Sequence, residues 1–248
     1  MKSSSYKHLI ISISSIVGII VLYEVFALVN KNDMFFPSFI DIIKGIGNII
    51  SNKGILLLLK TILKILIVIG VSFIISLLIC FINYVFKYNV DMVNPIIFII
   101  KAVPFAIVSV YLYILLFETK EIIPYIVSFL VIFPIVYDGV KHGLSINRDI
   151  IDELSLIDGS KRMKYEKVYL PLALSPMLIT FMQSLSLGIK VMVMSEYICG
   201  VSKSIGEIIN DAKLTLDFTL ILGWLILLVL IIVIFDLILG ILKKKLDY

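Results

Sequence analysis

Residues 150–176, IIDELSLIDGSKRMKYEKVYLPLALSP, place a short charged segment between two long apolar runs. Half of residues 152–167 are charged, with the acidic side chains mostly early and the basic ones later. That order matches the dipole of one helix, or of two short helices separated near Asp158. Pro171 lacks a backbone amide and disfavours helix in the residue before it, so we expect this helical unit to end at Leu170.

The rest of the chain is too apolar for a soluble domain. Of its 248 residues, 60% are hydrophobic, and the mean hydropathy is +1.11. A membrane span needs about 20 predominantly apolar residues to cross about 30 Å of hydrocarbon. Since lipid offers no partner to unpaired backbone groups, the sequence predicts an all-α integral membrane protein. Six transmembrane helices are expected, at 9–29, 61–86, 94–117, 123–143, 170–198 and 218–242.

The distribution of Lys and Arg predicts the orientation. With the N-terminus in the cytoplasm, twelve basic residues lie on the cytoplasmic side, seven lie on the other side and three lie within spans. We therefore expect a multi-pass protein of the cell (inner, cytoplasmic) membrane with both termini in the cytoplasm. The basic residues are too dispersed to predict a nucleic-acid surface, so the lipid bilayer is the expected charged partner.

No catalytic or metal-binding motif is visible in the sequence. It has no G-x-x-x-x-G-K-[ST], H-E-x-x-H or C-x-x-C, and only two histidines. Cys80 and Cys199 lack the spacing of metal ligands. We expect one transmembrane domain over 1–248 that is not an enzyme and holds no cofactor. If it does ATP-driven work, another polypeptide supplies the ATPase.

The charged segment ends in Val-Tyr-Leu-Pro at residues 168–171. It resembles the EAA loop of ABC importer permeases, whose pattern is Glu-Ala-Ala, three residues, Gly and, further on, an apolar residue, any residue and Leu-Pro. An ungapped match, which we prefer, puts Asp152 at the glutamate and Asp158 at the glycine. The other match puts Glu153 and Gly159 at these two positions, which leaves the loop one residue short.

Two earlier segments resemble the nitrate/sulfonate/taurine permease group of that family. FFPSFIDII, residues 35–43, is similar to its Leu-Pro-Ser-Pro segment, with Phe39 at the second proline. NPIIFIIKAVPFAIVSVYLYILLF, residues 94–117, is similar to its Pro…Arg-x-Ile-Pro segment. Here Lys101 takes the place of the arginine and Pro104 that of the following proline.

Two later segments extend the resemblance over nearly the whole chain. SLGIKVMVMSEYI, residues 186–198, is similar to the fifth span of the group, which ends in Ala-Glu, with Ser195 and Glu196 at that pair. Residues 204–248 resemble its Gly-Leu-Gly turn, last span and basic tail. The chain thus resembles a permease of the binding-protein-dependent type I importers, a group that also includes carriers of thiamine precursors. The implied fold is the six-helix type I importer (MetI-like) architecture.

The resemblance implies a function and a set of partners. The chain is expected to form the path for a small anionic or heterocyclic solute, beside a second permease copy in a homodimer. Two ABC ATPase subunits, which bind ATP and Mg, and an extracytoplasmic substrate-binding protein or lipoprotein are expected as partners. The cytoplasmic coupling loop is expected at about 145–169. Its predicted ATPase contacts are Asp152, Glu153, Asp158, Gly159, Ser160, Lys161, Arg162, Leu170 and Pro171. The alternative is a basic loop that only fixes topology.

Charges within spans are costly and are treated as functional candidates. Lys190 is predicted to face a water-filled path and attract an anion; the alternative is that it pairs with a carboxylate elsewhere in the bundle. Glu196, Lys101 and Pro104 are further candidates for the path, although Lys101 could instead snorkel to the interface. Lys64 is expected to reach the outer interface. An ion-coupled secondary transporter or channel is the competing function.

Overall fold

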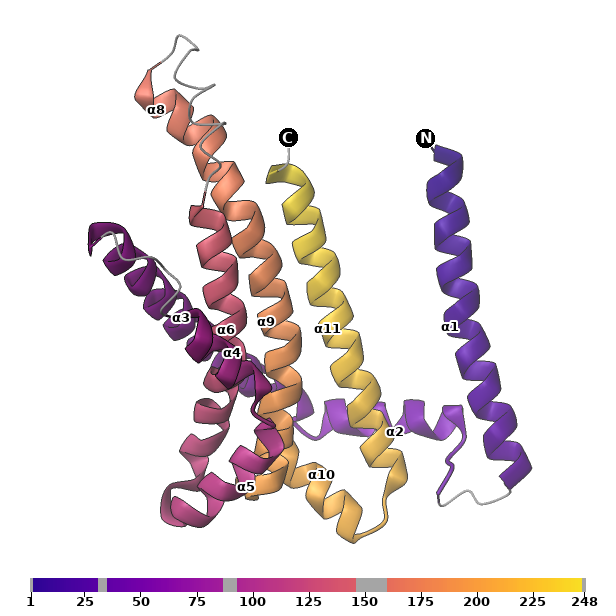
Figure 1. Cartoon of the computed structure of the whole chain (residues 1–248). Helices are drawn as coiled ribbons and strands as arrows, with labels where there is room; N and C mark the ends of the chain where they lie inside the picture. The colour runs from indigo at the N-terminus through magenta and orange to yellow at the C-terminus, as the bar shows by residue number, and fades with distance from the viewer. Residues whose placement is uncertain (1, 31–34, 87–92, 146–159, 247–248) are drawn as a thin grey trace. The chain divides into compact units, whose positions relative to one another are not determined.

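A computed structural model describes residues 2–30, 35–86, 93–145 and 160–246, and every regular element in these ranges is helical. This agrees with the all-α prediction. Figure 1 shows the elements along the chain. They are α1 (Lys2–Asn30), α2 (Phe39–Ser51), α3 (Gly54–Phe86), α4 (Asn94–Ala102), α5 (Phe105–Leu115), the 3₁₀-helix η2 (Phe117–Ile122), α6 (Ile123–Leu144), α8 (Lys161–Lys164), the π-helical turn η3 (Tyr165–Tyr169), α9 (Leu170–Cys199), α10 (Ile205–Leu214) and α11 (Phe218–Leu246).

Four helical segments are long and apolar enough to cross a membrane, or five if one bent pair counts as a span. The four segments are Gly54–Val85, Phe117–Leu144, Arg162–Cys199 and Phe218–Ile238, and they overlap four of the predicted spans. Within α1, Val17–Asn30 qualifies as a shorter apolar helix of the kind that has 10–17 residues. The chain is therefore a multi-pass membrane protein, while the number six stays a prediction.

The segment 94–117, predicted as one span, is two short helices instead. α4 and α5 have 9 and 11 residues and meet at an angle of 85°. At 1.5 Å per residue they are about 14 and 17 Å long, so neither crosses about 30 Å of hydrocarbon alone. The break follows from Pro104, which has no amide to donate and which favours the extended conformation seen at Val103.

The prediction that the charged unit ends at Leu170 is wrong. Helix continues from Lys161 through Pro171 to Cys199, by way of α8, η3 and α9. The π-helical turn directly before Leu170 changes the hydrogen-bond register where the proline has no amide, so the proline falls in the first turn of α9. A π-bulge is one of the recognised ways in which a helix accommodates such a defect.

The chain divides into two compact units. The larger unit comprises residues 56–207 and 228–248, and the smaller comprises 1–55 and 208–227. In the larger unit, α6 and α9 form the most extensive helix pair. Small residues allow this close packing, since a Cβ atom added at Gly139 would lie 1.8 Å from the Thr180 hydroxyl oxygen.

A second glycine continues that interface. A Cβ atom at Gly143 would lie 2.6 Å from the carbonyl oxygen of Ala173, so residues 139–143 act as a G-x-x-x-G helix-packing motif. Nine buried apolar residues complete the core around α6 and α9: Ile65, Val68, Ile69, Ile132, Val136, Val140, Leu185, Ile189 and Met192.

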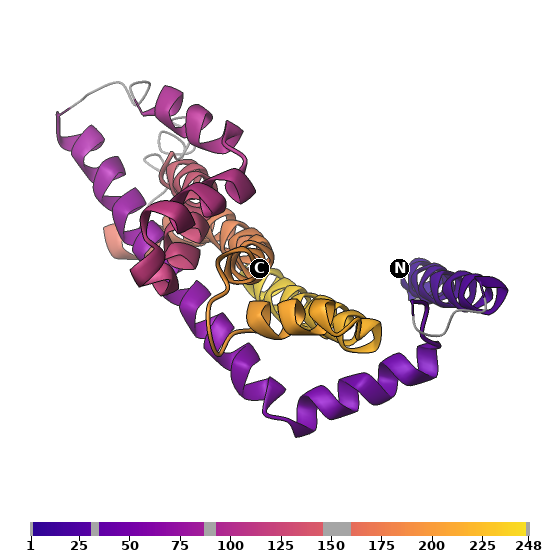
Figure 2. The same cartoon turned by 90° about the horizontal axis from the view of Figure 1, so that it is seen from below.

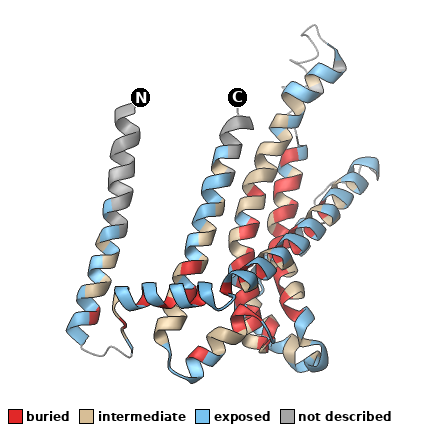
Figure 3. Ribbon diagram, turned by 180° about the vertical axis from the view of Figure 1, so that it is seen from behind, coloured by how far each residue is buried: buried red, intermediate tan, exposed pale blue. Residues whose placement is uncertain are grey.

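The two ends of the larger unit differ in packing. α6 and α9 run antiparallel, so α6 ends and α9 begins at the same end of the unit, together with the C-terminal part of α11 (Figure 1). The buried residues of α9 all lie between Thr180 and Cys199, towards the other end (Figure 3). The described start of α8 and the last turns of α11 thus lie at one end of the larger unit, and the orientation of this end in the membrane stays a prediction.

In the smaller unit, α2 lies across the end of α1. Figure 2 shows α2 side-on and α1 nearly end-on, in agreement with Figure 1. Ser38 caps α2 by accepting a hydrogen bond from the Asp41 amide at 3.2 Å. The Ser38 hydroxyl in turn donates to the Asp41 carboxylate, and with the Lys44 ammonium it holds the pKa of Asp41 below its ordinary value.

Candidate functional site

A groove lined by both apolar and polar side chains runs along α6, α9 and α11 of the larger unit. It consists of two adjoining hollows of about 670 and 600 Å³ that share Ile135, Ile179 and Gln183 as lining residues. Ordinary membrane-facing helix surfaces are apolar, so polar groups gathered at this depth indicate contact with water or with protein. The polar side chains that line the groove are Asp138, His142, Thr180, Gln183, Ser186, Lys190 and Asp236.

Lys190 differs from the other two lysines that were placed within spans. Lys64 and Lys101 are both paired with carboxylates. Lys190 is exposed and lines the larger hollow, and it makes no ion pair within the described parts of the chain. Asp236 lines the same hollow without a salt bridge to Lys190. The groove therefore contains an ammonium group that forms no salt bridge with the described residues, although the Asp236 carboxylate lines the same hollow.

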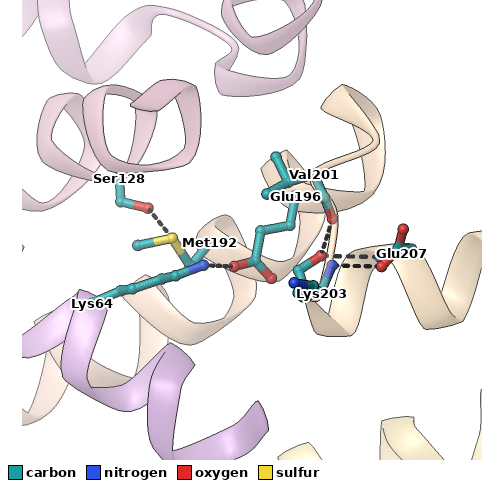
Figure 4. Close-up of polar contacts among 8 residues, drawn as sticks. Lys64, Ser128, Met192, Glu196, Val201, Lys203 and Glu207 are labelled. Carbon is teal, nitrogen blue, oxygen red and sulfur yellow. Dashed lines mark hydrogen bonds and ion pairs between the residues drawn. The ribbon is translucent and has the colours of Figure 1, made fainter. Parts of the chain in front are cut away.

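Glu196 lies away from this groove, inside the bundle. Its side chain is fully buried, and its Oε1 atom lies 2.7 Å from the Lys64 ammonium nitrogen on α3 (Figure 4). The same ammonium lies 5.9 Å from the centre of the Tyr125 ring on α6. Lys64, expected at the outer interface, thus joins three helices instead. Its partner is 132 residues away in sequence, which is why sequence spacing did not reveal the pair.

The turn after Glu196 is held in one tight arrangement. Gly200 ends α9 in the left-handed conformation, with φ of 57°, and its carbonyl accepts a hydrogen bond from Lys120 at 2.6 Å. A Cβ atom at Gly206, in the first turn of α10, would lie 2.5 Å from the Glu196 carbonyl carbon. Only glycine therefore permits this approach of α10 to the end of α9.

Two side-chain hydrogen bonds fix the start of α10 at the same place. The Ser204 hydroxyl accepts from the Glu207 amide at 3.1 Å, as an N-cap side chain does. The Glu207 carboxylate accepts from the Lys203 amide, one residue before the cap, at 2.5 Å (Figure 4). The sequence signal Ser-x-x-Glu was present at 204–207 and was missed. On the other side of α9, the Ser109 hydroxyl of α5 lies 3.3 Å from that of Ser195. This end of α9 is thus bonded to several neighbouring elements.

Lys101 and Pro104 lie at the break between α4 and α5. Lys101 forms an ion pair with Asp138, one of the groove-lining residues, and both side chains are about half exposed. One turn further along α6, Lys141 donates to the Asn94 side chain at 3.1 Å. These two contacts attach α4 to α6. Pro104 is exposed and is not among the residues that line the groove.

The described part of the predicted coupling loop begins at Ser160. Its hydroxyl accepts from the Met163 amide at 3.2 Å and so caps α8, which starts at Lys161. Arg162 pairs with Glu166 at 2.8 Å on an exposed helix face. Leu170 is exposed and Pro171 half-buried in the first turn of α9. The remaining predicted contacts, Asp152, Glu153, Asp158 and Gly159, lie outside the described residues.

The polar side chains of the groove are spread over three helices and are not gathered at one point. Among the described residues, no group of three or more His, Cys, Asp or Glu side chains could hold a metal ion. The groove has a cation, two carboxylates and several neutral polar groups, spread along three helices. Such a surface can contact a polar solute along the depth of a membrane without binding it at one closed site.

Comparison with known proteins agrees with this description. A search of curated proteins found no match to the chain. Residues 91–248, well over half of the chain, match the family model for binding-protein-dependent transport system inner membrane components. This range includes α4 to α11 and hence every residue of the groove. The chain belongs to this family, and it is a membrane permease subunit of a binding-protein-dependent ABC transporter, not an enzyme.

Proposed function

We propose that this chain forms the translocation path of an ATP-driven importer for a small anionic solute, of the nitrate/sulfonate/taurine type. The groove on α6, α9 and α11 is the path. The observation that carries the proposal is Lys190, an exposed ammonium group in the groove without an ion-pair partner among the described residues. A heterocyclic solute, which would rely on the neutral polar groups, is the other possibility within the same transporter group.

Lys190 differs in its electrostatic surroundings from Lys64 and Lys101. A Lys at the centre of a span costs at least about 2.5–3.5 kcal/mol on insertion scales. Carboxylates offset that cost at Lys64 and Lys101. At Lys190, water in the groove and a passing anion would offset it. Asp236 lines the same hollow and would repel an anion, so contact with the solute is expected nearer Lys190 than Asp236.

A second copy of the chain would supply the other wall of the path. The groove is open along one side, and lipid is a poor cover for Lys190, Gln183 and Asp138. A homodimer would place two such grooves opposite each other. The resulting water-filled space would accept a solute from an extracytoplasmic substrate-binding protein or lipoprotein.

Coupling to ATP is assigned to the segment around 150–171. Two ABC ATPase subunits would bind ATP and Mg and contact this segment, which leaves the chain itself without a cofactor. The proposal places both termini and the segment in the cytoplasm and the protein in the inner membrane. It is supported by the shared end of α8, α9 and the C-terminal helix in the larger unit (Figure 1).

Uptake by Lys190 variants tests the path. Lys190→Met removes the charge at similar length, and Lys190→Arg keeps it as a matched control. We expect the Met variant to lose most uptake of the ligand that co-purifies with the binding protein, while the Arg variant keeps it. Normal uptake by Lys190→Met at normal expression would rule out this role for Lys190.

Co-purification of the ATPase tests the coupling segment. Gly159→Trp and Asp152→Lys should each reduce both ATPase recovery and uptake. Asp211→Lys, the same charge reversal on an exposed position of α10, should leave ATPase recovery unchanged. If all three variants retain the ATPase and transport normally, the segment does not form the contact.

One observation favours the competing function, an ion-coupled secondary transporter or channel. Broken helices and intramembrane acids are typical of ion-coupled carriers, and the α4–α5 break lies beside the Lys101–Asp138 pair. The two functions differ in their energy source. Uptake in proteoliposomes that depends on internal or external ATP together with a separate ATPase supports the importer, whereas uptake driven by an ion gradient alone supports the alternative.

A further inference from the structure

The helix α2 presents three distinct faces. Ile42, Gly45 and Ile49 are buried. On a helix with about 3.6 residues per turn, Ile43, Ile50 and Ile40 lie on the adjacent sector and are 53%, 46% and 63% exposed. The third sector is polar and exposed, with Asp41, Lys44, Asn48 and Ser51. The exposed isoleucines continue the buried face, so together they form one apolar side opposite the polar one.

The buried face of α2 packs on the first turns of α11. A Cβ atom at Gly45 would lie 3.0 Å from the Thr219 methyl group, and one at Gly223 would lie 3.0 Å from the Ile49 side chain. Both contacts belong to the smaller unit. Because α11 is one of the candidate spans and begins at Phe218, these contacts hold α2 at the level where that span starts.

The end of α1 fixes the start of α2. The Tyr23 hydroxyl donates to the Pro37 carbonyl at 2.8 Å, and the Phe39 amide donates to the Glu24 carboxylate at 2.9 Å. The rings of Phe26 and Phe36 meet edge to face, with centres 5.0 Å apart. With α2 lying across the end of α1 (Figures 1 and 2), a membrane-crossing α1 requires that α2 lie along the membrane surface.

We infer that α2 is an in-plane helix whose exposed isoleucine face, Ile40, Ile43 and Ile50, is immersed in the lipid bilayer at the acyl–headgroup boundary. Two observations identify lipid as the occupant. The exposed apolar sector is continuous with the face that packs on a span, and exposed apolar side chains of α1, such as Phe26 and Val29, lie at the same end of the smaller unit. The polar sector, with its Asp41–Lys44 ion pair, then faces water.

Spin labelling tests the inference independently of transport. A nitroxide is attached to Ile43→Cys or, as a matched control on the polar sector, to Asn48→Cys. The full chain is reconstituted into phosphatidylcholine–phosphatidylglycerol vesicles, and collision with oxygen and with a water-soluble nickel chelate is measured by power saturation. The unmodified chain, labelled in parallel, supplies the signal from Cys80 and Cys199.

The label at 43 should show an oxygen-to-nickel collision ratio several-fold above that at 48, with a depth of about 5–10 Å below the phosphates. Ile50→Cys repeats the measurement should the first variant fail to fold. Equal ratios at the two sectors overturn the inference, because the isoleucine face would then be no more immersed in lipid than the polar face. Low collision of the labels at 43 and 50 with both oxygen and the nickel chelate, together with dipolar broadening between two nitroxides, also overturns the inference. A second copy of the chain would then cover the isoleucine face of α2.

Discussion

Loss of one charge from the Lys64–Glu196 pair should destabilise the bundle unequally, according to which charge remains. Lys64→Met leaves the Glu196 carboxylate fully buried without its counter-charge. Glu196→Met leaves Lys64, whose side chain is 22% exposed and still lies over the Tyr125 ring. A partly exposed lysine can move its ammonium towards water, whereas a buried carboxylate has no such route. The lysine variant should therefore be the less stable of the two.

The magnitudes follow from burial. Removing one partner of a buried ion pair costs about 3–5 kcal/mol, and we expect Lys64→Met to fall in that range. For Glu196→Met we expect about 1.5–3 kcal/mol, the value of one hydrogen bond to a charged group. The double variant replaces the pair by apolar side chains of similar length, an exchange that is often neutral in other proteins. It should be more stable than Lys64→Met alone.

Unfolding by SDS in mixed micelles, followed by circular dichroism, measures these free energies in one double-mutant cycle. The cycle isolates the pair energy as long as each single replacement removes the interaction without adding a new one, and for this reason both positions receive an uncharged apolar residue. Two outcomes would refute the reasoning. Either Lys64→Met is no less stable than Glu196→Met, or the double variant is no more stable than Lys64→Met.

Three further predictions use the same unfolding measurement. Gly206→Ala should cost about 1–3 kcal/mol, because its Cβ would lie 2.2 Å from a backbone nitrogen of the last turn of α9, while Gly70→Ala, with no atom within 4 Å, should be neutral or slightly stabilising. Lys101→Met and Asp138→Asn should each cost about 1 kcal/mol or less, since that pair is half exposed; a cost equal to that of Lys64→Met would contradict this. Ser38→Ala should cost about 1 kcal/mol through loss of the α2 cap. In that variant the pKa of Asp41 should rise towards its ordinary value, and the NMR titration of this carboxyl group should move to higher pH. In the parent chain, the stabilisation that the Asp41 carboxylate provides is present above pH 3.8. It is lost as the pH falls through the lowered pKa.

The broad organisation of the chain was predictable because it depends on local composition. Hydropathy located the four segments that qualify as spans. The family match agrees with the resemblance to ABC importer permeases, which was first noticed at the Leu170–Pro171 end of the charged segment. The break in 94–117 also had a visible signal in the sequence, the Val103–Pro104 pair, because proline disfavours helix in the residue before it. From this rule we predicted a helix end at Pro171 but not at Pro104. At Pro171 the same rule failed, because a π-helical turn absorbed the defect.

The contacts of the site were less predictable, because they join residues far apart in sequence. Lys190 and Glu196 lie six residues apart on α9, and sequence alone treated both as candidates for one path. In the structure they face different surroundings: Glu196 meets Lys64 inside the bundle, while Lys190 lines the groove. Which face of an apolar helix is covered depends on its neighbours, and a helix that is apolar all round carries little signal about that.

The packing of α9 suits a helix that moves about one end. From Thr180 to Cys199 it is buried against α3, α5 and α6, and the turn after it is closed by Gly200, Gly206 and the α10 cap. From Leu170 to Ile179 none of its residues is buried, and this half leads directly into α8 and the charged segment. A force applied at that segment would therefore meet the contact of Ala173 and Met177 with Gly143 of α6, but no fully buried residue, before Thr180. The groove-lining residues Ile179, Thr180 and Gln183 lie where the burial changes, so a tilt of the less buried half would alter the width of the groove while the more buried end stays in place.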